Sequence, residues 1–401
     1  MSEINKQIHS KRDDIRLSRP IVWFFVLTAI CVFGRQSVLA SLPLSETMYN
    51  IVRYGGTLGL FLIALPKIKK KYHVWFLGLE VLFGFSYLLS YLRGYMLSAN
   101  IVTYCVITLV ICIPSCIAIA SIDNYEILYK RLLYGSFPIA AIVILFMFSP
   151  ANTSLYSMSG AYQLVLTGAI HYNEVYRSKK WKWLFLFLTG LQLVAIFIKG
   201  ARGPLLCLIA FLAIKTFFEF RGNIKAMAFS FLGIVALVIA AQNSSTIMSW
   251  VGVKLDSAGL YSRNFQYIMN NELFNDSGRN TFRDRAIDLI WENPLFGYSA
   301  SSDVKLLGGQ YTHSLPIELV FDFGIIVGGL LFIYLTYHVL HSFLIPGGTE
   351  KDLRMIFLTQ GYLMLFFSGT YLQSVYLFLF LGMAISSIYG SRIKIRRLAR
   401  K

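Results

Sequence analysis

Long apolar segments, separated by short clusters of lysine and arginine, run through most of the chain. Several of them reach the ~20 residues that a helix needs to cross the hydrocarbon core of a bilayer. In that core each backbone N–H and C=O has to find its hydrogen bond within the protein, and an α-helix satisfies nearly all of its own. Because 56% of the residues are hydrophobic and only 14% are charged, we predict an all-α polytopic membrane protein.

The apolar segments predict about twelve transmembrane helices. We expect them at residues 21–42, 51–66, 73–92, 99–121, 132–149, 157–173, 183–198, 204–219, 226–241 and 315–342, with two more inside 353–390 that are separated near 370–373. The predicted organisation has three parts: an N-terminal segment and nine-span bundle over 1–241, a large extracytoplasmic loop with short helices over 242–312, and a three-span part with a basic tail over 313–401.

The basic clusters predict the orientation, because cytoplasmic loops carry an excess of lysine and arginine. With twelve spans, the clusters in the first 20 residues, at 67–71, at 177–182 and after residue 391 all fall on one side. Both termini are therefore expected in the cytoplasm, and the loop at 242–312 on the opposite face. The net charge of +17 is accounted for by these loops, so nucleic acid is not an expected partner.

A second group of cations falls on the extracytoplasmic side of this topology, against the usual bias. Cations inside a span are costly to bury and usually face a cavity and a partner. A diphosphate is one natural partner, because a guanidinium group matches phosphate oxygens with two hydrogen bonds. The group consists of Arg35, Arg53, Arg93, Lys199, Arg202, Arg279, Arg283, Arg285 and His313.

Most of these residues also have a structural interpretation. Arg35 can pair with Glu80, Arg53 and Arg93 can face water or lipid headgroups, and Arg283 and Arg285 can form a solvated helix face. The structural interpretation is weaker for three residues at helix boundaries and turns. These are Arg202, within the segment IKGARGPLL, Arg279, after Ser-Gly, and His313, at the start of a span.

The stretch from 277 to 324 combines the features expected of a site. Its first apolar residues recur at helical spacing and Pro294 ends the pattern; these residues are Phe282, Ala286, Leu289 and Ile290. A glycine-containing turn region follows, and His313 then precedes a long apolar run. Glu318 lies five residues further on and can orient the histidine or fill a polar cavity.

Several motifs occur in one order along this part of the chain: IKGARGPLL, SGR, WENPLFGY, YTHS with a following Glu-Leu pair, and FGIIVGG. In this order they resemble the O-antigen ligase and polymerase superfamily, over about residues 160–340. The family signature typically has His-Asn, whereas this chain has Ser314 after His313. The earlier spans resemble the family only as apolar helices.

The resemblance implies a GT-C-type glycosyltransferase of the bacterial inner membrane, active on the periplasmic face without cofactor or metal. The implied donor is an undecaprenyl-diphosphate-linked oligosaccharide. The diphosphate would be bound by Arg202 and Arg279, with Arg35, Arg283 and Arg285 as further candidates; His313 would be the general base and Glu318 its orienter. No DxD motif occurs in the loop, which disfavours a metal-bound nucleotide-sugar donor.

Two acceptors are compatible with this family. An O-antigen polymerase transfers the glycan to another lipid-linked repeat, and an O-antigen ligase transfers it to lipid A-core. We favour the polymerase because the histidine motif is a variant and polymerases diverge with their glycan. Membrane lipids and a chain-length regulator protein are expected partners. A lipid-linked glycan transporter is the lowest alternative, since transporters carry polar residues near the midplane and here they gather on one side.

Overall fold

The computed structural model describes residues 3–34, 45–96, 101–148, 158–199, 202–220 and 278–398, together with 253, 254 and 257. By contacts the chain forms two compact units. The first consists of Met1–Phe24, Tyr54–Arg131 and Asp276–Lys401, and the second of Phe25–Arg53 and Leu132–Asn275. The division predicted at residues 241 and 312 separates membrane spans from the large loop, a different criterion from contacts between residues. It stays a prediction.

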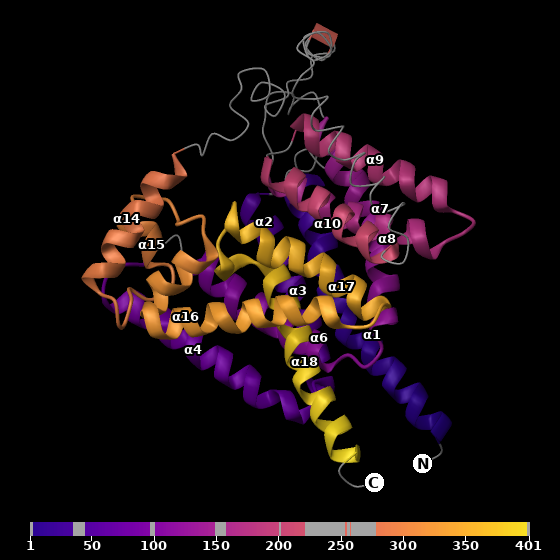
Figure 1. Ribbon diagram of the computed structural model, residues 1–401, viewed down its shortest axis with the longest axis horizontal. Coiled ribbons are helices and arrows are strands. Elements are labelled where there is room, and N and C mark those ends of the chain that lie inside the picture. The colour runs from indigo at the N-terminus through magenta and orange to yellow at the C-terminus, as the bar shows by residue number, and fades with distance from the viewer. Residues whose placement is uncertain are drawn as a thin grey trace. The chain divides into compact units, whose positions relative to one another are not determined.

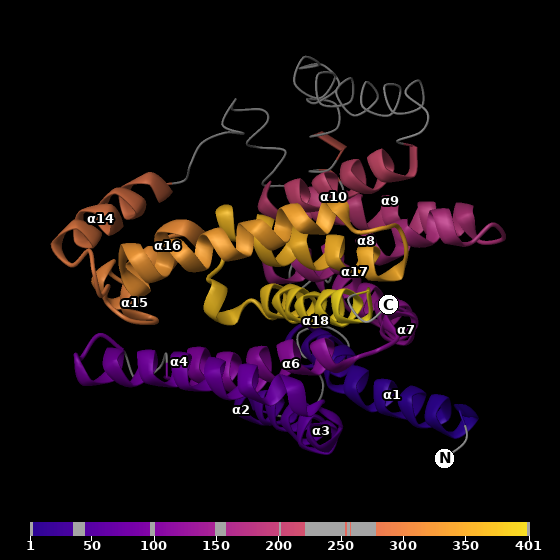
Figure 2. The ribbon, with the colours of Figure 1, turned by 60° about the horizontal axis from the view of Figure 1, so that its bottom comes forward.

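The first unit contains most of the helices that concern the site (Figures 1 and 2). They are the first part of α1 (Glu3–Thr28), α3 (Gly56–Ala64), α4 (His73–Leu92), a π-helical segment (Ile101–Cys112), α6 (Ile113–Ser121), α14 (Arg279–Glu292), α15 (Ser302–Leu306), α16 (Leu315–Leu344), α17 (Thr349–Leu358) and α18 (Val375–Leu398). α6 and α18 pack so closely that a Cβ at Gly382 would lie 2.1 Å from the carbonyl oxygen of Cys116. Small residues allow this approach between helices in a membrane.

The second unit contains α2 (Glu46–Asn50), most of α7 (Tyr125–Met147), α8 (Met158–Arg177), α9 (Lys182–Lys199) and α10 (Arg202–Phe220). α8 packs against both α9 and α10, and its His171 is fully buried. Gln192 lies 2.8 Å from Nδ1 of this histidine and Ser136 lies 2.9 Å from Nε2. The imidazole therefore has a partner at each nitrogen, which is how an apolar interior accommodates a polar ring.

The all-α polytopic membrane class is confirmed. Seven described helices are long and apolar enough to cross a bilayer, and two shorter apolar helices accompany them. The predicted span at 73–92 coincides with α4, and the predicted break near 370–373 lies in a short 3-10 turn, Tyr371–Gln373, before α18. The predicted span at 226–241 lies outside the described residues, so the number of twelve stays a prediction.

The ends of three segments that were predicted to share a side lie together in the first unit. Oδ1 and Oδ2 of Asp14 accept hydrogen bonds from the backbone N–H groups of Asp123 and Asn124, at 2.9 and 3.0 Å. Lys67 forms an ion pair of 3.1 Å with Asp13. The N-terminal segment thus meets the 3-10 turn Leu65–Lys67, just after α3, and the turn after α6, and the topology itself stays a prediction.

α16 is interrupted at Gly324, which has φ 78° and ψ 169°. Only glycine adopts this backbone conformation readily. The twenty residues from Ile325 to Leu344 give a helix about 30 Å long, which is the thickness of the hydrocarbon core. The sequence predicted one continuous span at 315–342; the structure instead divides this helix into a short segment before Gly324 and one segment of spanning length after it.

Candidate functional site

α14 presents two of the predicted arginines on the face that packs against the rest of the first unit. Arg279 and Arg283 are one helical turn apart, and Ala286 and Ile290 continue the same face and are buried. These apolar side chains belong to a cluster with Tyr298, Leu307 and Phe321. Arg285 lies on the other side of the helix and is exposed, as its solvated-face interpretation requires.

The two arginines donate hydrogen bonds to backbone carbonyls at the end of a helical segment. Arg279 Nη1 donates to the carbonyl of Phe367, and Arg283 Nη2 donates to that of Phe366 at 3.0 Å. Carbonyls at a helix C-terminus lack intrahelical partners and carry partial negative charge, so guanidinium groups are stabilised there. This contact fixes α14 against the segment that precedes α18.

Arg283 also contacts the predicted catalytic histidine. Its Nη2 donates to the backbone carbonyl of His313 at 2.8 Å. His313 has φ 52°, in the left-handed region that non-glycine residues rarely adopt. Its ring lies 4.1 Å, centroid to centroid, from that of Tyr311. Nδ1 is buried and has no hydrogen-bond partner among the described residues.

The imidazole of His313 is held in its neutral form. Burial and the charges of Arg279 and Arg283 lower its pKa to about 4, because each of them disfavours a second positive charge. A neutral imidazole can accept a proton. A bound anion would raise the pKa of His313 again, because it would offset the two guanidinium charges.

Of the two interpretations of Glu318, the one as orienter placed its carboxylate at His313, whereas the carboxylate contacts the segment before α18. Thr370 Oγ1 donates to its Oε1, and the backbone N–H of Tyr371 donates to Oε2 at 3.5 Å. Among the described residues, the hydrogen bonds of this carboxylate go to this segment and none goes to His313. Glu318 is 1% exposed, and its two hydrogen bonds fix the turn before α18 to the start of α16.

Two buried acids near Glu318 were missed in the sequence. Asp322 Oδ2 accepts a hydrogen bond from the Tyr371 hydroxyl at 2.6 Å. Asp303 Oδ1 accepts from the N–H of Val304 at 2.9 Å, and burial raises the pKa of Asp303 to about 7. The three carboxylates lie close enough to interact electrostatically. Glu318 and Asp322 are one turn apart inside an apolar run, and that spacing is the signal that could have identified the pair.

The remaining predicted arginines are placed as follows. Arg93, at the end of α4, donates to the carbonyl of Gly297 at 3.3 Å. Arg202 is the first residue of α10 and belongs to the second unit. Arg53 donates to Thr28 Oγ1 at 3.0 Å, also within the second unit. Arg35 lies outside the described residues, and with it the predicted pair with Glu80.

The first unit thus combines spanning helices with a site of two arginines, a neutral histidine and buried carboxylates, which defines a polytopic helical membrane protein with a polar site where α16 begins. Residues 184–333 match the family model described as O-antigen ligase. The matched region starts in α9 and ends within α16, and it contains α14, α15 and His313. The match supports the O-antigen ligase/polymerase superfamily, and a glycosyltransferase-like enzyme of O-antigen processing in a bacterial membrane. No curated protein and no solved structure matches the chain.

Proposed function

We propose that the protein is an O-antigen polymerase that transfers an oligosaccharide from undecaprenyl diphosphate to another lipid-linked repeat. One observation carries this proposal: Arg279 and Arg283 lie beside a neutral imidazole, that of His313, within the region that matches the family model. Two cations and a proton acceptor are what the displacement of a diphosphate by a hydroxyl group requires.

The proposed reaction exchanges one bond at the anomeric carbon of the donor sugar. A hydroxyl oxygen of the acceptor forms a bond to this carbon, and the bond from the carbon to the diphosphate oxygen breaks. The electron pair of that bond leaves with the undecaprenyl diphosphate. The hydroxyl proton moves to the imidazole of His313, which later releases it to water.

The arginines would bind the leaving group. Negative charge develops on the diphosphate as the bond breaks, and guanidinium groups can stabilise it with paired hydrogen bonds. The described bonds of Arg279 and Arg283 use one nitrogen of each group, while each guanidinium carries five N–H donors. The bound diphosphate would raise the pKa of His313 and make the imidazole a stronger base while the donor is present.

The predicted orientation supports a periplasmic site in the bacterial inner membrane, with both termini in the cytoplasm. Its basis is the distribution of lysine and arginine between the spans. Because arginines supply the positive charge, the proposed mechanism uses no metal. The diphosphate-binding role of Arg202 rests on its motif alone, and the role of Glu318 becomes support of the turn at 370–371.

An O-antigen ligase is the second candidate, because the matching model is described as O-antigen ligase. It would use the same donor and base, with a hydroxyl of lipid A-core as acceptor. A transporter would move the lipid-linked glycan without forming a glycosidic bond, so the products separate all three functions.

The test uses purified protein in proteoliposomes with the undecaprenyl-diphosphate-linked repeat alone or together with lipid A-core. We expect lengthened glycans on undecaprenyl diphosphate with the repeat alone. Product only with lipid A-core would replace the polymerase by the ligase. His313→Ala should lose about 10²–10⁴ in rate. The matched control is Thr281→Ala, an exposed position of α14, and equal rates for both variants would refute the assignment of the base.

A further inference from the structure

The turn after α14, residues 294–298, is hydrogen-bonded to the backbone of α16 at the point where this helix is interrupted. The backbone N–H of Ile325 donates to the carbonyl of Pro294 at 2.7 Å, and the N–H of Tyr298 donates to that of Phe321 at 2.8 Å. A Cβ at Gly324 would lie 2.1 Å from the carbonyl oxygen of Leu295. No side chain fits between the two backbones, so the turn is held at one position along the axis of α16, next to Gly324.

Two helical segments that are long enough to cross a bilayer end at the position of this turn. The segment of α16 that is long enough to cross the hydrocarbon core begins at Ile325. α4 belongs to a candidate span that ends at Leu92, and the next residue, Arg93, donates to the carbonyl of Gly297 in the turn. Figures 1 and 2 both show α14 and α15 beside the beginning of α16. Two segments of sufficient length and apolarity to cross a bilayer therefore both end at this turn.

Large apolar side chains in the turn and at the end of α14 are exposed. Phe296 is 77% exposed, Trp291 70%, Leu295 58% and Ile287 40%. Ile287 and Trp291 are one turn apart on α14, next to the buried face. An exposed apolar patch of this kind marks an interaction surface.

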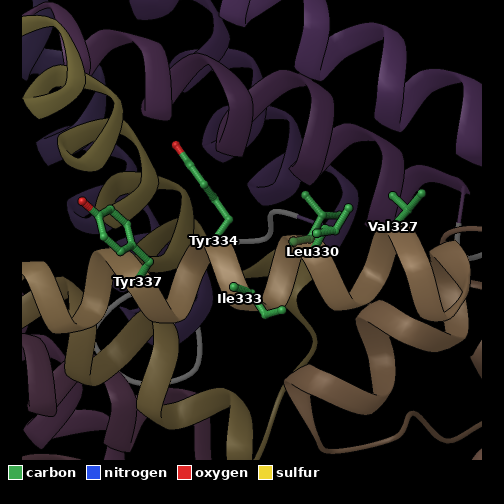
Figure 3. A pocket seen from close by; sticks show the side chains of 6 residues that line it. Val327, Leu330, Ile333, Tyr334 and Tyr337 are labelled. Carbon is green, nitrogen blue, oxygen red and sulfur yellow. The ribbon is translucent and has the colours of Figure 1, made fainter. Parts of the chain in front are cut away.

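The patch continues into apolar surface on the neighbouring helices. At the start of the spanning segment of α16, Ile326 is 59% exposed, and at the end of α4, Leu92 is 70% exposed. Further along α16, apolar side chains line an open hollow, and Figure 3 shows Val327, Leu330 and Tyr334 projecting from the same side of the helix. Exposed apolar side chains along a spanning helix are those that face lipid.

We propose that Ile287, Trp291, Leu295 and Phe296 insert into the bilayer at the boundary between headgroups and acyl chains. The occupant of the patch is thus the lipid surface itself. Tryptophan is enriched at this boundary, and helices with one apolar edge lie in it. α14 then lies on the membrane with its arginine face directed toward the protein. This contact is independent of the proposed glycosyl transfer.

The test places an environment-sensitive fluorophore at two positions of the patch, in the variants Phe296→Cys and Trp291→Cys. Each variant is reconstituted in vesicles of phosphatidylethanolamine and phosphatidylglycerol. Thr281→Cys is the matched control, because this residue is exposed on a different side of α14. Labelled wild-type protein gives the background from the native cysteines.

We expect blue-shifted emission at positions 291 and 296, quenching by lipids that carry a nitroxide on the acyl chain, and little quenching by aqueous iodide. Position 281 should show the opposite pattern. Iodide quenching at 291 and 296 equal to that at 281 would overturn the proposal. Protection from both quenchers would also overturn it, since it would show that protein covers the patch. Because no glycan is used, failure of this test is separate from failure of the proposed function.

Discussion

Replacement of Gly324 by alanine should be among the most destabilising single changes in the first unit. At φ 78° and ψ 169°, a residue with a Cβ is strained by about 1–3 kcal/mol. The added Cβ would lie 2.1 Å from the carbonyl oxygen of Leu295 and 3.0 Å from the backbone nitrogen of Phe296. Overpacking against immobile neighbours typically costs a further ~1–3 kcal/mol. We therefore expect a loss of about 2–6 kcal/mol in the free energy of unfolding.

Gly329 provides a matched control in the same helix. A Cβ there would meet nothing within 4 Å, so Gly329→Ala should be neutral or stabilising by up to ~1 kcal/mol. Gly328→Ala should resemble Gly324→Ala, because its Cβ would lie 2.3 Å from the carbonyl oxygen of Leu319.

The assay is unfolding of the purified protein in mixed micelles by titration with sodium dodecyl sulfate, followed by tryptophan fluorescence. Because the strain and the overlap both act where the turn meets α16, Gly324→Ala should also alter accessibility at Phe296. Equal unfolding free energies for Gly324→Ala and Gly329→Ala would refute the interrupted geometry of α16.

Three further predictions concern the site and the topology. The pKa of His313 is about 4 without substrate, so the base form is present above that pH. Since kcat/KM reports the free enzyme, it should show no loss from His313 protonation until the pH approaches 4. An acid limb near pH 6.5 that disappears in His313→Ala would contradict this. Tyr371→Phe should cost about 1–3 kcal/mol in unfolding free energy, because it leaves the buried Asp322 carboxylate without its donor, and an equal loss in an Asp322→Leu background would exclude the bond as the cause. Gln310 and Lys70 are both exposed, and a membrane-impermeant maleimide added from the periplasmic side should label Gln310→Cys and leave Lys70→Cys unlabelled. The reverse labelling would refute the proposed orientation.

The sequence alone was sufficient for the class of the protein and for much of its local structure. Apolar length and helical periodicity are properties of consecutive residues, so α4 was predicted at its observed bounds. The amphipathic pattern that ends at Pro294 predicted α14, with Ala286 and Ile290 on its buried face. The order of motifs around His313 indicated the superfamily that the match over residues 184–333 supports.

Tertiary structure decided which of these residues act together. Sequence distance suggested Glu318 as a possible orienter of His313, yet its carboxylate hydrogen-bonds to Thr370 and Tyr371, about fifty residues further along the chain. Partners so distant in sequence are brought together by helix packing, and no local pattern encodes them. The same holds for Arg283, whose guanidinium contacts backbone carbonyls, because carbonyls exist at every residue and carry no sequence signal.

The interruption of α16 shows the division between the two levels most directly. Within an apolar run, Gly324 is compatible with an unbroken transmembrane helix, and periodicity alone predicts one. The interruption exists because the backbone at Pro294–Gly297 occupies the space where a Cβ would be and forms hydrogen bonds across it. A contact between two backbones depends on where the chain returns, and so the length and polarity of the segment determined that it spans the membrane, while the packing of a distant turn determined where the span begins.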